Sequence, residues 1–417
     1  MTTEDVLYIA GGSLLVGLSI FCANLLLLRR SNRHVHGPLA LFFLAQAAAE
    51  APLLIGRIAE IQGAHAAARV IWPLNLPTAL MLAPLFWLYV RALTTEGRVR
   101  DVPLKALHVA PALVGLCVML LFLGVPKDLL TSSAEEAAPD HVLTTALVVS
   151  AWTIVVLFYA QICLYLVLVA RLLRRYTARL KDLFSSTESR ELRWLWWIVA
   201  VTTGFVLVNV ALSLSQLLGV PVLAGDVLGT VPVDMFFSVA IFWVLALWGL
   251  RQTPGLETPA MAGAAPASSA MGRHKYERSA LSEDRAQRLA RKVAAAMRDD
   301  RLYRDPNLSL WDLSTHIGVT SNHLSQTLNE TLGASFFDYV NRWRIEDAAE
   351  RVRTTDETIL AIAYDVGFNS KSSFYKAFKR HLGKTPSALR DEGAAGAAAA
   401  RAGDVGGSDE IGARRTA

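Results

Sequence analysis

The side chains of this sequence that are suited to chemistry gather on two helix-forming stretches in its last third, about 49 residues apart. They are amides, hydroxyls and ammonium groups at the outer positions of the predicted helices: Ser321, Asn322, Ser325 and Gln326 in the first stretch, and Lys371, Ser372, Tyr375, Lys376 and Lys379 in the second. Such groups exchange hydrogen bonds with a ligand. A paired-histidine metal motif, a nucleophile elbow and a glycine-rich phosphate loop do not appear in the sequence. The pattern therefore predicts a binding surface, and neither an enzyme nor a metal or cofactor site.

The apolar residues of both stretches predict the same local fold, two short helices joined by a tight turn. Gly318 separates two apolar stripes in the first stretch, and Gly367 does so in the second. The stripes are Leu310, Leu313 and Ile317, then Val319, Leu324 and Leu328; and Ile359, Ile362, Ala363 and Val366, then Phe374 and Phe378. Apolar residues on both sides of a glycine turn are typical of a helix-turn-helix. One such pattern is weak evidence, but two in tandem, with basic residues on the second, are much stronger.

Two further helices are predicted around these units. Residues 281–297 carry apolar side chains at helical spacing, with Glu283 and Asp284 in the first turn, where a helix dipole favours acids. Between the two units, an amphipathic helix that can hold them together carries Phe336, Tyr339, Val340, Trp343, Ile345 and Ala348. The stretch from Arg273 to Arg390 has ordinary globular composition, with 20 Lys/Arg against 15 Asp/Glu.

Residues about 283–390 resemble the DNA-binding domain of the AraC family of bacterial regulators. The matching residues are Gly318, Leu324, Gly333, Phe336, Tyr339, Arg344, Ile345, Ile359, Ile362, Ala363, Gly367, Phe368, Ser373, Phe374, Phe378, Lys379, Gly383, Thr385 and Pro386. The closing stretch, GF-x5-F-x3-FKR-x2-G-x-TPS, is highly specific to that family. Ser314, where Ala is usual, and Leu328, where Phe is common, depart from the family pattern but suit a helix interior. Because the soluble barrel of most members is missing here, the resemblance is to the membrane-embedded group of AraC-type regulators.

The resemblance implies how the two units would meet double-stranded DNA. Each recognition helix would enter a major groove, the two adjacent grooves lying one helical turn, about 34 Å, apart. The implied base readers are Asn322, Ser325 and Gln326 in the first unit and Lys371, Ser372 and Lys376 in the second. Asn and Gln can pair bidentately with adenine. The implied phosphate contacts, Lys379, Arg380 and Lys384, would give affinity without sequence information. The alternative for this basic run is a solvated helix end.

The first 250 residues have a different composition. The whole chain is 53% hydrophobic and 18% charged, and nearly all the apolar excess lies in this part. A helix needs about 20 apolar residues to cross the hydrocarbon of a bilayer. Seven stretches qualify: about Val6–Leu28, Pro38–Ile55, Val70–Leu93, Leu104–Val125, Val142–Val169, Trp194–Leu218 and Leu228–Leu250. The second is the weakest, because it is short and Glu50 and Pro52 interrupt it.

The Lys and Arg residues near the ends of these spans predict an orientation. The loops after spans one, three and five hold 14 of them, whereas the opposite loops hold only Arg57, Arg69 and Lys127. The N-terminus is therefore expected outside the cell (inner) membrane. An odd number of spans then places the C-terminal domain in the cytoplasm. The first span is expected to be a retained anchor, because its positive charges follow the apolar run instead of preceding it.

Polar groups inside the spans are the candidates for a sensing site: Glu50, Trp72, Asn75, Gln161, Asn209, Gln216 and Asp234. Because an ionisable residue in hydrocarbon is costly, Glu50 and Asp234 are expected to face the bundle interior or a water-filled cavity. Pro73, Pro77 and Pro84 are expected to break or kink the third span. The alternative is that the polar groups form interhelical hydrogen bonds or lie near the interface.

The sequence therefore predicts an all-α chain, a polytopic bundle of about seven transmembrane helices followed by a tandem, homeodomain-like helix-turn-helix domain. The expected boundaries are residues 1–251 for the membrane domain, a candidate sensor, and 274–390 for the double helix-turn-helix. Residues 252–273 are Pro/Gly/Ala/Ser-rich and are expected to be a flexible linker. The Ala/Gly-rich residues 391–417 cannot bury a core and are expected to be a disordered tail.

Three functions remain open for such a chain. The first is a membrane-anchored, sequence-specific transcription regulator, in which a signal acting on the bundle alters DNA binding. The second is a transporter or membrane enzyme with an accessory DNA-binding domain, which would require paired charges or an internal repeat in the spans. The third is a tethered regulator with no ligand, for which a single span would suffice. The expected partners are DNA and the lipid bilayer; RNA polymerase, a second copy of the chain and the signal ligand remain open.

Overall fold

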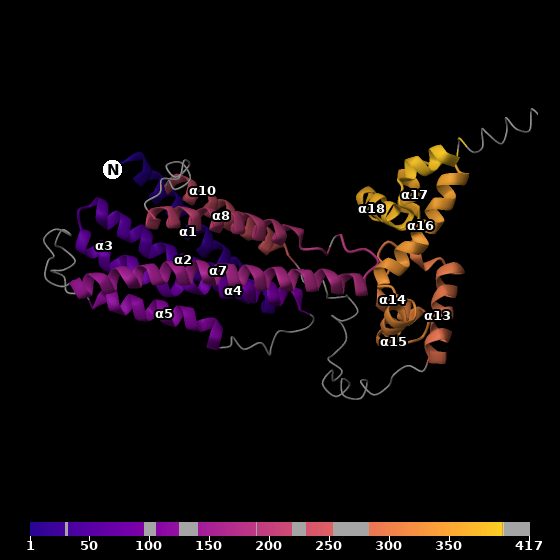
Figure 1. Ribbon diagram of the computed structural model, residues 1–417, viewed down its shortest axis with the longest axis horizontal. Helices are drawn as coiled ribbons and strands as arrows, with labels where there is room; N and C mark the ends of the chain where they lie inside the picture. Colours follow the sequence, from indigo (N-terminus) through magenta and orange to yellow (C-terminus); the bar gives the residue numbers. More distant parts are fainter. Residues whose placement is uncertain are drawn as a thin grey trace, which may run out of the picture. The chain divides into compact units, whose positions relative to one another are not determined.

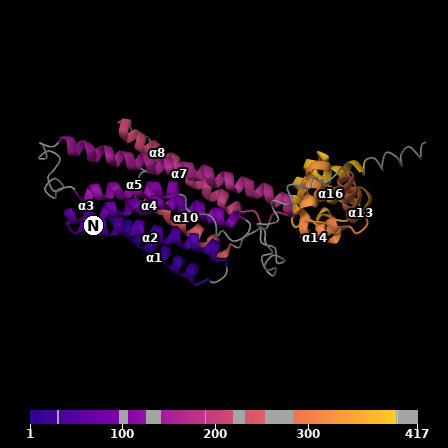
Figure 2. The ribbon, with the colours of Figure 1, turned by 90° about the horizontal axis from the view of Figure 1, so that it is seen from below.

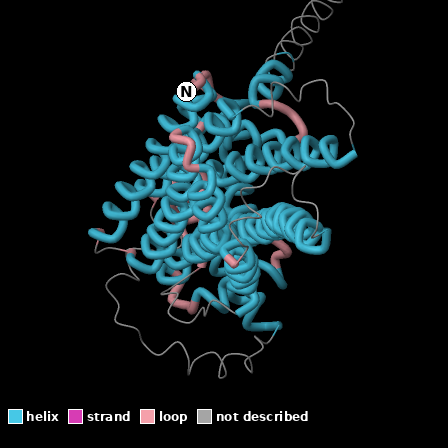
Figure 3. Tube along the Cα trace, turned by 90° about the vertical axis from the view of Figure 1, so that its left-hand side faces the viewer, coloured by secondary structure: helices cyan, strands magenta, loops and turns pink. Residues whose placement is uncertain are grey.

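The structure of the chain is a computed structural model. It describes residues 1–29, 32–95, 106–124, 141–188, 190–218, 231–252, 283–393 and 395. The predicted linker lies outside these residues apart from Gln252, and so does nearly all of the predicted tail. Every element in the described part is helical (Figure 3), and the only pairing of extended backbone there is an isolated antiparallel bridge between Phe184 and Ser309.

The chain forms two compact units, and each unit contains two separate stretches of the sequence. The first unit comprises Met1–Tyr176 and Leu192–Ala262. The second comprises Thr177–Glu191 and Gly263–Ala417. The chain therefore passes into the second unit, returns to the first, and then enters the second unit again.

The first unit is a bundle of long helices that run beside one another (Figures 1 and 2). Its elements are α1 (Thr3–Leu28), α2 (Arg33–Ile61), α3 (His65–Ile71), η1 (Trp72–Asn75), α4 (Leu76–Thr94), α5 (Ala106–Leu123), most of α7 (His141–Leu183), α8 (Arg193–Leu218) and α10 (Val231–Arg251). Helix α1 packs on α2 and α10, while α4 packs on α2 and α5. Large apolar side chains remain on the outside, among them Phe21 at 61% exposed and Trp197 at 74%. Such a surface suits hydrocarbon better than water.

The prediction of seven spans was wrong in number. Within the described residues, five helices are long and apolar enough to cross a membrane: Thr3–Leu28, Arg33–Ile61, His65–Thr94, Trp152–Leu183 and Arg193–Ser215. The fourth predicted stretch forms α5, whose 18 residues are fewer than the span length of about 20. The seventh forms α10, which has 21 residues, but its described side chains cover only the shorter apolar part Met235–Arg251. The predicted stretch Leu104–Val125 was therefore wider than the helix α5 that it contains.

Proline interrupts the third span as predicted. The chain breaks between α3 and α4, where Pro73 lies in the 3₁₀ turn η1 and Pro77 begins the next helix. Pro84 stays inside α4. In the first turn of a helix, proline loses no hydrogen bond, because its missing N–H would have had no partner there.

Besides residues 177–191 and the helical residues 386–393, the described part of the second unit contains a series of mostly short elements. They are α13 (Glu283–Arg298), η2 (Leu302–Arg304), α14 (Leu310–His316), α15 (Ser321–Gln326), η3 (Thr327–Thr331, one turn of π-helix), α16 (Phe336–Thr354), α17 (Ile359–Asp365) and α18 (Lys371–Leu382). Five of the helices begin at a hydroxyl N-cap whose oxygen accepts the amide N–H three residues later: Ser309, Thr320, Ser335, Thr358 and Ser370. Each such cap is worth about 1 kcal/mol, so the sequence fixes where these short helices start.

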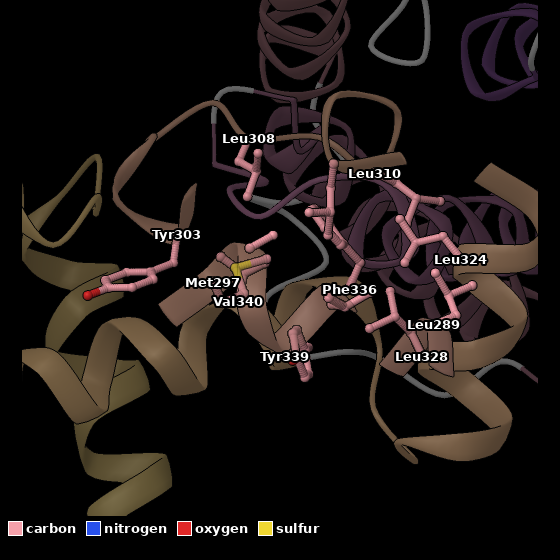
Figure 4. Packing of buried hydrophobic residues seen from close by; sticks show 13 residues of the cluster. Leu289, Met297, Tyr303, Leu308, Leu310, Leu324, Leu328, Phe336, Tyr339 and Val340 are labelled. Carbon is pink, nitrogen blue, oxygen red and sulfur yellow. The ribbon is translucent and has the colours of Figure 1, made fainter. Parts of the chain in front are cut away.

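Two apolar clusters form the core of the second unit, and α16 contributes to both. The first cluster joins α13, α14 and α15 to Phe336, Tyr339 and Val340 at the start of α16. Figure 4 shows Leu289, Leu310, Leu324 and Leu328 gathered around Phe336. The second cluster joins α17 and α18 to Ile345, Ala348, Ala349 and Val352, farther along α16. The predicted connecting helix therefore exists, and it gives each half of its length to one helix-turn-helix.

Candidate nucleic-acid interface

The first helix-turn-helix, which we call module 1, comprises α14, the turn at Gly318, and α15 with η3. Gly318 has φ +68°, a left-handed conformation that glycine adopts without strain. Leu313 and Leu324, on the two sides of the turn, are completely buried. Burial of this face leaves the opposite face of α15 at the surface.

The predicted base readers of module 1 lie on that outer face. Asn322 is exposed, and Ser325 and Gln326 are half-buried. The amide of Gln326 donates to Glu330 Oε2 at 2.8 Å, one turn later. The Ser325 hydroxyl accepts a longer bond, at 3.4 Å, from Asn329. The three side chains are therefore neutral groups on one helix, two of them held by local hydrogen bonds.

The second helix-turn-helix, module 2, comprises α17, the turn at Gly367, and α18. Gly367 has φ +98°, and a Cβ atom there would lie 2.7 Å from Tyr303 O and 2.8 Å from Arg304 O. Real Cβ atoms do not approach carbonyl oxygens so closely, so only glycine fits both this conformation and this contact. Phe374 and Phe378 are completely buried and attach α18 to the second cluster.

Module 2 presents cations where module 1 presents neutral groups. Lys371, Lys376 and Lys379 are exposed along α18, together with Ser372. Lys371 Nζ lies 5.4 Å from the ring centroid of Tyr375. The other predicted phosphate contacts already have acidic partners, because Arg380 pairs with Asp338 at 3.1 Å and Lys384 pairs with Glu392.

Arg344 of α16 ties the two modules together, which the sequence did not predict. It is only 1% exposed. Its Nε donates to Tyr303 O at 2.7 Å, and its Nη2 donates to Asp305 O at 2.8 Å. Its guanidinium carbon also lies 5.5 Å from the ring centroid of Phe368 in module 2. Burial lowers the pKa of Arg344 to about 10, so the side chain stays charged at neutral pH and needs these acceptors.

The remaining hydrogen bonds of Arg344 go to residues 177–191, a segment whose role here was also missed. Nη2 donates to Ser185 Oγ at 3.0 Å and Nη1 to Ser185 O at 3.3 Å. The Ser185 N–H and hydroxyl in turn donate to Leu308 O, at 3.1 and 2.7 Å. The only sequence signal was indirect, since Arg344 belongs to the family pattern but nothing marked its partner.

The first unit holds a separate cavity that contains one of the predicted sensing residues. The cavity has a volume of about 280 Å³ and is lined by Glu4, Tyr8, Leu53, Arg57 and Trp72. The Trp72 ring lies against α2, since a Cβ on Gly56 would meet it at 2.3 Å.

Arg57, which lines this cavity, is paired with two carboxylates. Arg57 forms ion pairs with Asp5 at 2.5 Å and with Glu60 at 2.7 Å. Sequence reasoning missed the pair with Asp5, because the two residues are 52 positions apart.

The other predicted sensing residues are not gathered at this cavity. Glu50 is half-buried on α2 and faces Gly12 of α1, where a Cβ would lie 3.4 Å from Glu50 Oε1. Asn75 is in η1, and the Asn209 amide donates to Phe205 O of its own helix at 3.0 Å. Gln161 is 6% exposed and donates to Leu80 O at 2.7 Å. It therefore forms an interhelical hydrogen bond, the alternative to a sensing role. Asp234 and Gln216 are in α10 and α8, but their side chains lie outside the described residues.

Comparison with known proteins points to the same part of the chain. A family model described as a helix-turn-helix domain matches residues 313–392. An uncharacterized HTH-type transcriptional regulator of Staphylococcus aureus (strain COL) is 40% identical over 91 residues, which are 22% of this chain and 12% of that protein. The HTH-type transcriptional activator AarP of Providencia stuartii is 39% identical over 83 residues, 20% of this chain and 62% of AarP. The chain thus spans less than two thirds of the length of both relatives.

Among solved structures, the C-terminal domain of AraT, a response regulator from Geobacillus stearothermophilus, is 27% identical with a TM-score of 0.23; the match covers 25% of this chain and 84% of that one. Residues 313–392 form an AraC-type helix-turn-helix domain.

Proposed function

We propose that the chain is a membrane-anchored, sequence-specific DNA-binding transcription regulator. The observation that carries the proposal is the pair of modules on one helix, α16, each with an apolar face packed in a core and polar side chains on the outer face of its second helix. Two such helices, joined through the shared helix α16, match the requirement of two successive major grooves on one face of DNA.

In this proposal the two modules divide the work of recognition. Asn322, Ser325 and Gln326 read base edges from α15, and Lys371, Ser372 and Lys376 do so from α18. Lys379 binds phosphate. Arg380 and Lys384 bind phosphate only after exchanging Asp338 and Glu392 for it, and that exchange makes their contribution smaller than that of an unpaired cation.

The proposal is tested by selecting from random-sequence duplexes with the full-length protein in lipid nanodiscs. We expect a bipartite motif whose half-sites are about one helical turn apart. A selection without sequence enrichment, or with a single unpaired half-site, would contradict the proposal.

We propose further that the C-terminal domain lies in the cytoplasm of the cell, with the N-terminus outside. DNA is accessible only there, and the end of α7 carries a dense group of basic residues, Arg171, Arg174, Arg175, Arg179 and Lys181. Positive charge beside a span favours the cytoplasmic side. A topology reporter fused after Arg251 is expected to be active only if it is cytoplasmic, and an external location would exclude DNA binding as the function.

The cavity beside Trp72 favours a sensor over a passive anchor, and we propose that it receives the signal. Tyr8 and Trp72 offer aromatic faces, and Glu4 adds a carboxylate, whereas the charge of Arg57 is balanced by Asp5 and Glu60. Aromatic rings and a carboxylate together suit a small organic cation.

Phenethylammonium is a suitable probe of this site, with neutral 3-phenylpropanol as its control. The cation is expected to raise the Tm of the full-length protein, and Trp72→Ala is expected to abolish the shift. Trp197→Ala removes an exposed tryptophan of the same unit and is the matched control. Equal shifts from both compounds would exclude a cation site.

A further inference from the structure

Residues 177–191 form a part of the second unit that comes from the middle of the membrane half of the sequence. They comprise the last two turns of α7 and the connection toward α8. Both flanking helices belong otherwise to the first unit. Apart from residues 253–282, this segment is therefore a second covalent route between the units.

The segment is built into the second unit like a core element. Phe184 is 2% exposed, Ser185 1% and Thr187 3%. Phe184 pairs with Ser309 in the antiparallel bridge, and its ring meets that of Trp311 with centroids 5.7 Å apart. Leu183 packs against the first apolar cluster. The side chains of these residues are therefore shielded from water, and both backbone groups of Ser185 are hydrogen-bonded within the unit.

The contacts of the segment reach both modules. Phe184 and Ser185 hold Leu308 and Ser309, the residues that lead into α14 of module 1. Ser186 Oγ accepts from Asn369 Nδ2 at 3.0 Å, one residue before the N-cap of α18 in module 2. Ser185 also completes the hydrogen bonding of Arg344 between the modules. The segment thus fixes the starts of two helices relative to each other.

We propose that residues 177–191 are a clamp that holds modules 1 and 2 in the DNA-binding arrangement, and that the membrane unit regulates DNA binding through this clamp. The inference rests on the proposed function. A ligand that needs both recognition helices at once binds more tightly when their arrangement is fixed beforehand. Because α7 continues as one helix from His141 to Leu183, the clamp is attached to the membrane unit without an intervening linker. Withdrawal of the clamp therefore lowers DNA affinity.

Docking of the clamp on modules 1 and 2 is tested by cutting the chain within residues 253–282, which form the other connection between the two units. A specific protease site is inserted between Gln252 and Glu283 of the full-length protein in phosphatidylcholine vesicles, whose headgroups carry no net charge. After cleavage, the fragment from Glu283 onward is expected to sediment with the vesicles, held by the clamp alone. Phe184→Ala and Ser185→Ala are expected to release it. Glu188→Ala, on a half-buried residue of the same segment, is the control and should retain it.

Release of the wild-type fragment as readily as that of Phe184→Ala would overturn the proposal. Hydrogen exchange of the released fragment verifies folding, because α16 and α18 should keep their protected amides. The milder variant, Ser185→Ala, keeps the test valid if Phe184→Ala proves unstable.

Regulation through the clamp is tested with the bipartite duplex from the selection. Ser185→Ala is expected to weaken binding about fivefold or more, the usual range of coupling between sites. Binding to a single half-site should change little, because one module needs no partner. Duplicating residues 253–272 should also change little. An equal loss on both duplexes, or a larger loss from the longer linker, would overturn the clamp. If the wild type binds no bipartite duplex, the proposed function itself fails.

Discussion

Modules 1 and 2 share a fold but differ in chemistry and in support. Module 1 offers neutral amides and hydroxyls on α15, and its core is completed by α13 and by residues 177–191. Module 2 offers lysines on α18, and its core closes on α16 and on Leu389 near the end of the described chain. Neutral amides discriminate among bases by paired hydrogen bonds, whereas lysines also attract the backbone at a distance. If the chain binds DNA as proposed, we therefore expect selectivity chiefly from module 1 and affinity chiefly from module 2.

The modules also differ in how far along the chain the residues lie that complete their cores. Module 1 depends on residues 177–191, which are distant from it in sequence and lie between two helices of the first unit. Module 2 depends on nearby residues of α16 and on the close approach of Gly367 to η2. Arg344 is the element shared by both, and it provides the strongest test of whether the modules are separate.

Arg344→Met should produce the largest effect. It leaves Tyr303 O, Asp305 O and the Ser185 groups without their donor inside the protein, and each such loss costs about 1–3 kcal/mol. We expect a combined loss of about 4 kcal/mol and reduced hydrogen-exchange protection in both modules. Arg344→Lys should lose less, because an ammonium still donates. Loss of protection in one module alone would show that the two fold separately.

Replacing the turn glycine by alanine should cost more stability in module 2 than in module 1. Gly367→Ala places a Cβ against two carbonyl oxygens at a positive φ, and we expect it to cost about 3 kcal/mol. Gly318→Ala is the matched control, because it has a positive φ but open space around it. We expect that variant to cost about 1 kcal/mol. Equal costs, measured by hydrogen exchange in the full-length protein, would mean that the contact at Gly367 is not tight.

Gln326→Ala tests the selectivity of module 1. If Gln326 reads a base, its loss should reduce discrimination at one position of the motif by about 1–2 kcal/mol. Repeating the random-sequence selection measures this as relaxed preference at that position only. Glu330→Ala is the informative companion, since it frees the Gln326 amide from its hydrogen bond and should leave the preference in place. A relaxed preference at many positions would argue for misfolding of α15.

Lys379→Ala tests the affinity assigned to module 2, and its effect should be the smallest. Loss of one phosphate contact weakens binding to all sequences alike, and it reduces the slope of log K against log salt concentration by about 1. Titrations at several salt concentrations measure both. Arg380→Ala is the comparison, and its effect should be smaller because Asp338 already neutralises Arg380. A change of sequence preference in Lys379→Ala would assign this lysine to base reading instead.

The features that could be predicted from the sequence are those that depend on residues close together in the chain. Glycine turns, apolar stripes and the helix between the modules follow from spacing over a few residues, and all of them are present in the second unit. The capping hydroxyls are also local, so the helix starts were accessible from sequence. The break at Pro73 and Pro77 was predicted for the same reason.

The features that were missed join residues far apart. Arg344 and Ser185 are separated by 159 positions, and no periodicity relates them. Residues 177–191 look like a basic loop because two of their four buried members, Ser185 and Thr187, are small polar residues that mark no apolar stripe. The fourth span was counted because apolar composition continues past the ends of α5, whereas the span criterion depends on helix length.

If the chain binds DNA as proposed, helix α16 also restricts the spacing between the two half-sites that it can bind. Its 19 residues run through both cores, with Tyr339 and Val340 in one and Ile345 and Ala348 in the other. One base pair inserted between two half-sites shifts the second by about 3.4 Å and turns it by about 35° around the DNA axis. A packed helix does not stretch or untwist by that amount. Promoters under this control should therefore tolerate base changes within a half-site far better than a single insertion or deletion between the half-sites.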